Sequence, residues 1–239
     1  MLNHLGLFAK YWEPGKVKTR LAAGIGPQAA CRVYRCFLEH LVHGFAQFAD
    51  VRTIGFSPDD KNDEFQKLAG SDWNLIPQSP GDLGIRMHRF FEAAFKVNKN
   101  LTIEAATEPT RSKVILIGSD TPHLPLTLVE SAFEILDRNQ VVLGPCTDGG
   151  YYLIGMAEST YELFADVEWS TERVLVQTIT KLAEQQITYE TLPTMTDIDQ
   201  EADLMDLVCQ LRDSEHQLSA HDRELLEKLD RLKLEWASQ

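Results

Sequence analysis

The sequence predicts a doubly wound α/β fold, in which helices cover both faces of a mostly parallel sheet. Residues 114–117, Val-Ile-Leu-Ile, form a short apolar run that ends at Gly118 without alternating with polar residues. Such a run is typical of a strand buried on both faces of a parallel sheet. Strand patterns also alternate with helix patterns along the chain. This alternation favours the same fold, because parallel strands need crossovers, usually helical, to connect them.

Six short apolar segments are the expected strands: 5–9, 51–56, 75–77, 114–117, 141–145 and 187–192. Between them, apolar residues recur at steps of three and four residues, which predicts amphipathic helices that pack on the sheet. The expected helices are 27–48, 60–69, 87–95, 126–138, 174–182 and 204–211. Residues 98–112 are polar, lack periodicity and contain Pro109, so we predict a surface loop there.

The length and composition favour one main domain. A chain of 239 residues can bury a sizeable core, and 44% hydrophobic with 25% charged residues is ordinary for a globular protein. We expect a domain at 1–212 and a helical extension at 213–239. Leucines at roughly heptad spacing, among them Leu218, Leu225 and Leu229, predict that this extension packs on the domain or forms the interface of a homodimer.

The composition also excludes several kinds of partner. No apolar run approaches the roughly 20 residues that span a bilayer, and residues 1–9 are too short for a signal peptide, so we expect a cytoplasmic protein without a membrane partner. The formal charge of -13 argues against a nucleic acid, whose phosphates bind basic surfaces. The cysteines and histidines are scattered and form no zinc motif. Any bound metal is therefore expected to have oxygen ligands.

A basic loop follows the first strand. Four of the 23 basic residues, Lys10, Lys16, Lys18 and Arg20, lie there together with Gly15. A flexible backbone and several cations can form a cradle for a di- or triphosphate. The loop lacks the GxxxxGK[ST] pattern of a P-loop. A solvent-exposed basic turn is the alternative interpretation.

Two aspartates stand where elements begin or end. Asp120 follows the strand at 114–117, and ligands bind at the carboxyl edge of open α/β sheets, so its carboxylate is a candidate metal ligand. Asp199 opens a late helix and is a candidate partner for it. Two aspartates without a histidine suit Mg²⁺ or Mn²⁺, which prefer oxygen ligands. The structural alternative is that each aspartate caps the helix that follows it.

Glycines mark two further loops. Gly81 and Gly84 precede the helix at 87–95, where they indicate either close backbone approach to a ligand or simple entry into the helix. Gly149 and Gly150 lie between Asp148 and two tyrosines, which favours a ligand-facing turn over a plain connector. Cross-strand packing of the tyrosines is the alternative.

A third segment precedes the helix at 174–182. It contains Trp169, Ser170 and Thr171, and either hydroxyl side chain is expected to act as the N-cap of that helix.

Five motifs occur in an order that resembles one protein family. They are Ala9-Lys10 with residues 14–21 (PGKVKTRL), residues 81–87 (GDLGIRM), residues 118–122 (GSDTP), Gly144-Pro145 with residues 148–152 (DGGYY), and residues 169–171 (WST). Over about residues 4–210, the chain resembles the glycosyltransferase A-like bacterial family described as selenodomain- or arsenosugar-associated glycosyltransferases. The resemblance implies the nucleotide-diphospho-sugar transferase fold, a three-layer α/β/α, Rossmann-like arrangement with a mostly parallel mixed sheet.

The resemblance also implies roles for individual residues. Asp120 and Asp199 would bind Mg²⁺ or Mn²⁺, and Ser119 stands where the DxD pattern common in sugar transferases has its first aspartate. The residues expected at the nucleotide are Ala9, Lys10, Gly15, Lys16, Lys18, Arg20, Gly81, Leu83, Gly84, Arg86 and Ser119. The residues expected at the second substrate are Asp148, Gly149, Gly150, Tyr151, Trp169, Ser170 and Thr171.

Two reactions fit these expectations. In glycosyl transfer, the hydroxyl of a small-molecule acceptor attacks the anomeric carbon of a nucleotide sugar, with Asp148 as the expected base, while the metal and the basic loop stabilise the departing diphosphate. In nucleotidyl transfer, a phosphorylated substrate attacks the α-phosphate of a nucleoside triphosphate, and Lys16 and Arg20 stabilise the pyrophosphate as it leaves. We expect the first reaction. Nucleotidyl transfer is the alternative, and a catalytically silent nucleotide-binding or interaction module is the third reading.

Overall fold

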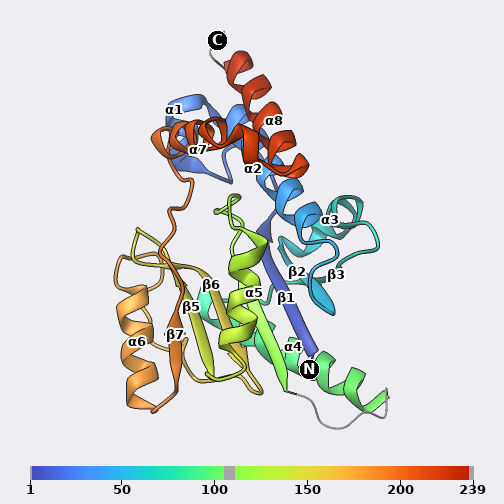
Figure 1. Ribbon diagram of the computed structural model, residues 1–239, viewed down its shortest axis with the longest axis vertical. Coiled ribbons are helices and arrows are strands. Elements are labelled where there is room, and N and C mark those ends of the chain that lie inside the picture. The colour runs from blue at the N-terminus through green and yellow to red at the C-terminus, as the bar shows by residue number, and fades with distance from the viewer. Residues whose placement is uncertain (1, 105–110, 237–239) are drawn as a thin grey trace.

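The computed structural model describes residues 2–104 and 111–236, and its strands form one sheet with helices on both faces (Figure 1). The strand order is β3-β2-β1-β4-β6-β5-β7. Neighbouring strands in the described residues are parallel, except that β6 runs antiparallel to β4 and β5. The strands are β1 (Leu2–Lys10), β2 (Val51–Ser57), β3 (Asn74–Pro77), β4 (Ser112–Ile117), β5 (Val141–Pro145), β6 (Tyr151–Ala157) and β7 (Tyr189–Thr191). The predicted fold class is confirmed.

The helices divide between the two faces of the sheet. Their bounds are α1 (Thr19–Ile25), α2 (Pro27–Gly44), α3 (Asn62–Ala69), α4 (Leu83–Glu104), α5 (Leu126–Ile135), α6 (Val174–Glu184), α7 (Glu201–Asp213) and α8 (Ala220–Trp236), with short 3-10 turns η1 (Asp59–Lys61) and η2 (Glu215–Gln217). Helices α2, α3 and α5 share one buried cluster with the sheet, whereas α4 and α6 share another. None of the helices in the described ranges combines the length and the apolar character that a membrane span requires.

The burial of β4 on both faces explains why apolar and polar residues do not alternate in its sequence. Ile115 and Ile117 belong to the cluster beneath α2, α3 and α5, whereas Val114 and Leu116 belong to the cluster beneath α4 and α6. Successive side chains of a strand point to opposite faces, so a strand covered on both sides needs apolar residues at every position. Burying each of these side chains contributes about 1.5–3 kcal/mol. This strand therefore anchors the centre of the sheet.

The point at which the strand order reverses lies between β1 and β4. The chain places β2 and β3 on one side of β1, and β4 on the other. The loops that leave the carboxyl ends of β1 and β4 lie at this point, where open α/β sheets form the crevice that binds their ligands. Both the basic loop and Asp120 emerge at this crevice.

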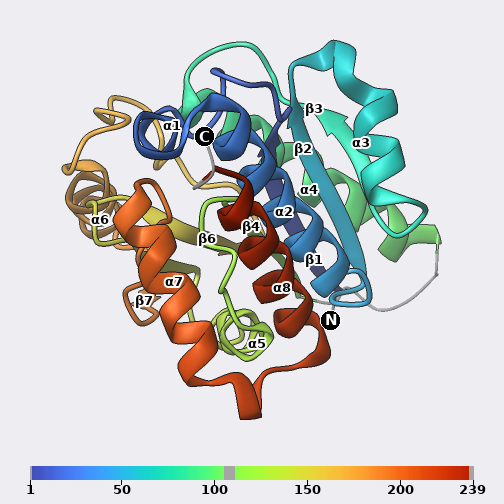
Figure 2. The same ribbon diagram turned by 90° about the horizontal axis from the view of Figure 1, so that it is seen from above.

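A third apolar cluster lies outside the sheet and joins α1, α2, α7 and α8. Figure 2 shows α8 running beside α2. Leu225 and Leu229 of α8 are buried in the same cluster as Phe37 on α2. The C-terminal helix therefore packs on the rest of this chain, on the side of α2 that faces away from the sheet.

The predicted loop at 98–112 is wrong at both ends. Helix α4 continues to Glu104 and β4 begins at Ser112, whereas residues 105–110 of this prediction lie outside the described residues. Asn98 shows the physical reason. Its amide is buried and bonds to His4 and to Ser112, at 3.0 and 2.8 Å. From the sequence alone, a polar residue that forms a hydrogen bond in the core cannot be distinguished from a polar residue of a surface loop.

The predicted N-cap of α6 is also wrong. The helix begins at Val174, with Arg173 at the N-cap position and no side-chain cap. Thr171 instead accepts a hydrogen bond from the Arg173 N–H, at 3.3 Å, within the turn that precedes the helix. Ser170 has a φ of 64°, so its backbone is left-handed and belongs to that turn. The other predicted elements are present, with ends that differ by a few residues.

Candidate active site

A cleft of about 710 Å³ opens at the crevice between β1 and β4. One end is polar, and its wall includes five acidic or basic side chains close to the strand ends. These are Arg20, Asp120, Asp148, Asp197 and Asp199. The other end is apolar and includes Phe8, Leu83, Met87, Tyr151, Trp169 and Val174. The cleft thus offers charged groups to one part of a ligand and an apolar wall to another.

Lys18 joins the two aspartates that the sequence predicts as metal ligands. Its Nζ lies 2.6 Å from Asp120 Oδ1 and 3.0 Å from Asp199 Oδ1. The Lys18 side chain is only 3% exposed. Its backbone is left-handed, with φ 47° and ψ 49°, at the N-cap position of α1. The basic loop therefore does not form a solvated turn at this residue.

The helix-cap interpretation fails for both aspartates. Helix α5 begins at Leu126 with Pro125 at its N-cap position, so Asp120 does not cap it. Helix α7 has its own capping box, in which Asp203 Oδ2 accepts the Gln200 N–H at 2.7 Å. Gln200 and Asp203 therefore cap α7 without Asp199. The carboxylate of Asp199 is consequently available to Lys18.

The electrostatics of this group follow from its contacts. Burial alone would lower the pKa of Lys18, but the adjacent carboxylates of Asp120 and Asp199 outweigh it and raise the pKa. Lys18 therefore carries a positive charge at neutral pH. Arg20 adds a second, weaker contact, with Nη1 at 3.8 Å from Asp199 Oδ2, and its side chain is 72% exposed. The guanidinium is thus accessible to an anionic ligand.

Ser119 and Ala9 hold the strand ends in place. The Ser119 hydroxyl lies 2.9 Å from the buried Tyr34 hydroxyl, which also accepts the Lys10 N–H at 3.0 Å. Burial raises the pKa of the Tyr34 phenol, so this group stays neutral. Ala9 is buried in the core. The Ser119 hydroxyl thus ties the end of β4 to α2 and β1.

Asp197 is a residue of the cleft that sequence reasoning missed. Its Oδ1 accepts a hydrogen bond from the Thr121 hydroxyl at 2.8 Å and from the Cys146 thiol at 3.2 Å. Burial raises the pKa of Asp197. The sequence did contain a signal, because Asp197 and Asp199 are two residues apart in an extended segment and can point to the same side. Ile198, between them, is buried.

A group that can hold a metal ion is present in the cleft. Cys146, Asp148 and Asp197 bring ligand atoms within 4.8 Å of one another. Burial raises the pKa of the Cys146 thiol, and a soft thiolate suits Zn²⁺ better than Mg²⁺ or Mn²⁺. The carboxylates therefore make up the useful donor set. Carboxylate oxygens fit Mg²⁺ or Mn²⁺.

The turn at Asp148 is built for close packing. Asp148 is exposed, and its Oδ1 accepts the Gly150 N–H at 2.8 Å. Gly149 has a φ of 87°, and a Cβ there would lie 2.2 Å from the carbonyl oxygen of Glu172. Only glycine fits that position without displacing the segment that contains Thr171 and Glu172. Gly149 therefore shapes the cleft wall and does not itself line the cleft.

The apolar end is shaped by a second glycine contact. A Cβ at Gly84 would lie 2.6 Å from Trp169 Nε1, so the indole packs directly on the first turn of α4. Tyr151, at the start of β6, reaches Met87 of α4 with its hydroxyl 4.0 Å from the sulfur. Leu83 stays 43% exposed at this wall. These residues form an apolar part of the cleft wall.

Comparison with protein families identifies the relatives of this chain. A family model described as an uncharacterized protein conserved in bacteria, DUF2064, matches residues 44–171, which is more than half of the 239 residues. The chain belongs to the DUF2064 family. The matched segment includes Asp120 and Asp148, whereas Lys18 and Asp199 lie on either side of it.

Two solved structures are similar to this chain. A crystal structure from Desulfovibrio desulfuricans G20, of a protein provisionally named a nucleotide-diphospho-sugar transferase, is 29% identical with a TM-score of 0.79, and the match covers 98% of this chain and 97% of that one. The 4-diphosphocytidyl-2C-methyl-D-erythritol synthase of Anaerococcus prevotii DSM 20548 is 9% identical with a TM-score of 0.52, over 88% and 98% of the two chains, which shows a shared fold. No curated protein matches. The predicted glycosyltransferase A-like family and fold are confirmed.

Several predicted residues of this DUF2064 protein do not line the cleft. Lys16 is 66% exposed and pairs with Glu13, at 3.1 Å, and Lys10 is exposed at the end of β1. Arg86 donates from Nε to the carbonyl of Gly81 at 3.0 Å, which holds the turn before α4. The predicted residues that line the cleft are Arg20, Leu83, Ser119, Asp120, Asp148, Gly150, Tyr151, Trp169, Ser170, Thr171 and Asp199. Gly15 has a φ of 79° in an open turn.

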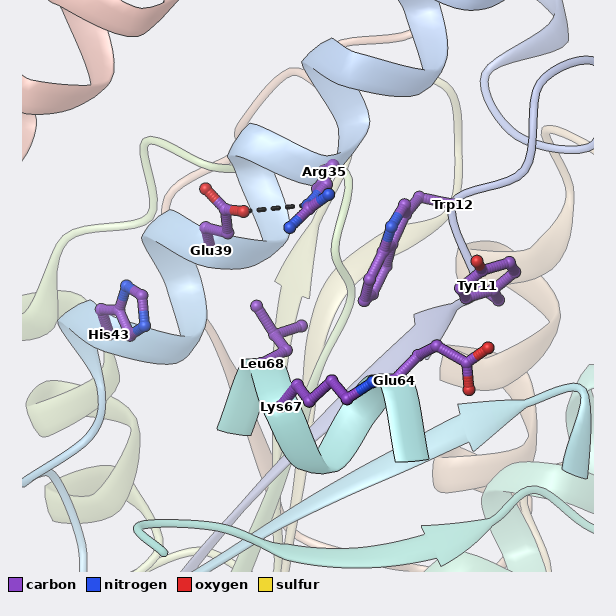
Figure 3. A pocket seen from close by; sticks show the side chains of 8 residues that line it. All are labelled: Tyr11, Trp12, Arg35, Glu39, His43, Glu64, Lys67 and Leu68. Carbon is purple, nitrogen blue, oxygen red and sulfur yellow. Dashed lines mark hydrogen bonds and ion pairs between the residues drawn. The ribbon is translucent and has the colours of Figure 1, made fainter. Parts of the chain in front are cut away.

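A second cavity of about 320 Å³ lies between α2, α3 and the start of the loop after β1 (Figure 3). Arg35 and Glu64, two of its charged side chains, pair with neighbours. Arg35 donates to Glu39 at 3.0 Å and lies 5.3 Å from the centre of the Trp12 ring, and Lys61 donates to Glu64 at 3.4 Å. The larger cleft is the better candidate active site, since it lies at the strand-order reversal.

Proposed function

We propose that this protein is a metal-assisted glycosyltransferase that moves a sugar from a nucleotide-sugar donor to a small-molecule acceptor. The observation that carries the proposal is the convergence of Lys18, Arg20, Asp120 and Asp199 at the reversal of strand order. Carboxylates and cations at this point suit a diphosphate with its metal ion. The relative from Desulfovibrio desulfuricans supports a nucleotide-diphospho-sugar as the donor class, because its name gives that activity and its chain is similar throughout.

The proposed reaction assigns a role to each end of the cleft. The acceptor hydroxyl forms a bond to the anomeric carbon of the donor while the bond from that carbon to the diphosphate oxygen breaks. Asp148, exposed in the cleft wall, takes the proton from the acceptor hydroxyl. Arg20 stabilises the departing diphosphate. A divalent cation bound by Asp120 and Asp199 would supply further positive charge there.

The acceptor is proposed to lie against the apolar wall. Trp169, Leu83 and Met87 present an apolar surface in the same cleft as Asp148. A surface of this kind binds the ring face or the alkyl part of a small molecule. This end of the cleft is thus assigned to the second substrate, together with the turn at Gly150.

Nucleotidyl transfer is the second candidate. The observation in its favour is that two cations of the loop after β1, Lys18 and Arg20, reach the acidic end of the cleft, where a leaving pyrophosphate needs positive charge. In that reaction the phosphate of the second substrate attacks the α-phosphate of a nucleoside triphosphate.

A ligand screen separates these candidates. Thermal unfolding is measured with nucleotide sugars and with nucleoside triphosphates, each with and without Mg²⁺ or Mn²⁺, because a ligand of the folded state raises the melting temperature. A larger shift with a nucleotide sugar supports glycosyl transfer, and a larger shift with a triphosphate supports the alternative. Asp120→Asn is expected to abolish the metal-dependent part of the shift, whereas Asp206→Asn, an exposed residue of α7, is the matched control. No shift with any nucleotide would refute both transferase proposals.

Arg20 provides a sharper test within the loop. Arg20→Ala is expected to weaken binding of the nucleotide by about 10- to 100-fold, since a hydrogen bond to a charged group contributes about 1.5–3 kcal/mol. Lys16→Ala is the comparison, because that side chain pairs with Glu13 outside the cleft. Affinities are measured by calorimetric titration. Equal losses for the two variants would mean that the whole loop closes on the phosphates.

A further inference from the structure

Lys18 lies between the two carboxylates that the proposed function assigns to a divalent cation. Its ammonium contacts Asp120 and Asp199 at 2.6 and 3.0 Å, and these are the carboxylates expected to hold the metal. Mg²⁺ binds carboxylate oxygens at about 2.0–2.1 Å. A divalent cation held by these two carboxylates would lie beside the ammonium, and two cations so close repel each other. The ammonium and a metal ion cannot both occupy this position.

We propose that the ammonium of Lys18 and a divalent cation occupy the position between Asp120 and Asp199 in turn. Without a metal, the ammonium keeps two like-charged carboxylates together. When a divalent cation binds, the ammonium leaves and becomes available to the phosphates of the nucleotide. Lys18 is therefore a residue that sets metal affinity and couples metal binding to nucleotide binding.

The surroundings of Lys18 allow its side chain to move alone. Val17 and Leu21, on either side of it, are buried and fix the backbone at the start of α1. The carboxylates that it contacts line a cleft of about 710 Å³, which gives the ammonium space on leaving. Arg20 does not replace it, because its nearest contact with Asp199 is 3.8 Å and its side chain is mostly exposed. The exchange thus requires a change of side-chain conformation only.

The inference predicts weak metal binding in the absence of a nucleotide. An incoming cation must break two ion pairs of a buried ammonium before it gains its own ligands. A nucleotide diphosphate removes part of this cost by giving Lys18 new anionic partners. Metal and nucleotide are consequently expected to strengthen each other's binding, by about 5- to 150-fold for a typical coupling between sites.

The first experiment is a titration with Mn²⁺ in the absence of nucleotide. The concentration of unbound Mn²⁺ is measured by electron paramagnetic resonance. Lys18→Met removes the charge and keeps a side chain of similar length. We expect this variant to bind Mn²⁺ about tenfold more tightly than the wild type, in the range of measured site couplings. Lys16→Met, which removes an exposed lysine of the same loop, is expected to leave the affinity unchanged. An affinity in Lys18→Met equal to or weaker than that of the wild type would overturn the proposal.

A second experiment uses the unmodified chain, because loss of the ammonium can also destabilise the fold. Lysines are labelled by reductive methylation and mapped by mass spectrometry, with and without saturating Mg²⁺. Lys18, almost fully buried, is expected to react slowly alone and several times faster with Mg²⁺, whereas the rate at Lys16 stays constant. An unchanged rate at Lys18 contradicts the exchange.

This inference rests on the proposed metal-assisted function, but the two fail separately. Nucleotide-sugar binding with equal Mn²⁺ affinities in Lys18→Met and the wild type would overturn the exchange and leave the function standing. Tighter Mn²⁺ binding in the variant, without binding of any nucleotide, would support the exchange and refute the function.

Discussion

His4 is a buried residue of β1 with polar partners at both ring nitrogens. Nδ1 lies 3.0 Å from Asn98 Oδ1, and Nε2 lies 2.9 Å from the Thr53 hydroxyl. The Asn98 amide nitrogen donates to Ser112, which turns its oxygen towards His4. A neutral ring that donates from Nδ1 and accepts at Nε2 satisfies all of these groups. Burial lowers the pKa of His4 to about 4.

Because His4 is buried and neutral, we predict that the protein loses stability in acid. The unfolded chain protonates His4 near pH 6.5, whereas the folded chain does so only near pH 4. The free energy of unfolding therefore falls as the pH drops from 6.5 to 4, by about 3 kcal/mol from this group, and does not depend on it above that window. Urea unfolding of His4→Gln should show a correspondingly smaller pH dependence. The exposed His216→Gln should keep the wild-type dependence, and an unchanged dependence in His4→Gln would contradict the prediction.

Variants at Gly15 and Gly149 can distinguish the cost of a strained backbone from the cost of crowding. Gly15 and Gly149 both have positive φ angles, 79° and 87°, but only Gly149 is crowded, with a carbonyl oxygen 2.2 Å from the place of a Cβ. We expect Gly15→Ala to cost about 1–2 kcal/mol of stability from strain. Gly149→Ala should cost about 1–3 kcal/mol more, because the segment at Glu172 must shift. Equal losses of unfolding free energy for the two variants in urea would show that the segment at Glu172 can shift without a cost.

Helix α8 is held by its apolar face. Leu229 is fully buried in the cluster with α1, α2 and α7. Leu229→Ala is expected to cost about 2–5 kcal/mol of unfolding free energy, as for other large-to-small changes in a core. Leu234, on the same helix, is 72% exposed, so Leu234→Ala should change stability by about 0.5 kcal/mol or less. Similar losses for both variants would contradict this packing.

Helix α2 links the two halves of the molecule. Its Leu38 and Leu41 side chains pack on the sheet, whereas Val33 and Phe37 pack in the cluster with α8. Ion pairs add to this contact, for example Lys228 with Glu39 at 3.3 Å and Arg32 with Glu235. An α-helix that is apolar on two sides must be covered on both. The role of α8 is thus to cover the second side.

The whole chain is therefore expected to depend on its C-terminal helix. A variant that ends at residue 212 keeps the sheet and the cleft but exposes Val33 and Phe37 of α2. We predict a lower melting temperature and binding of a hydrophobic dye, because the uncovered apolar surface loses its burial. An unchanged melting temperature without dye binding would mean that 1–212 is an independent domain with its own complete core. A homodimer through this helix stays a prediction, and analytical ultracentrifugation of the full chain tests it.

Across the described residues, six of the seven strands and most helices could be predicted from their own apolar patterns, but β6 (Tyr151–Ala157) was not among the expected strands. The run at 114–117 shows burial on both faces, and the steps in α2 show an amphipathic helix. The end of α4 could not be predicted in this way. Asn98 is polar in the sequence, yet His4 and Ser112, distant in the chain, satisfy it in the core. A local pattern cannot reveal a partner so far away.

The sequence by itself determined the α/β class, the motifs and the residue types from which a metal and phosphate site can be built. Only the tertiary structure decided which of them meet. It placed Lys18 between Asp120 and Asp199, added Asp197, and left Lys16 outside the cleft. The reason is physical: an aspartate that ends a strand can cap a helix, bind an ion or pair with a lysine. Which of these roles the aspartate takes depends on the charges that the fold brings within about 4 Å of it, where the electrostatic interaction is strongest.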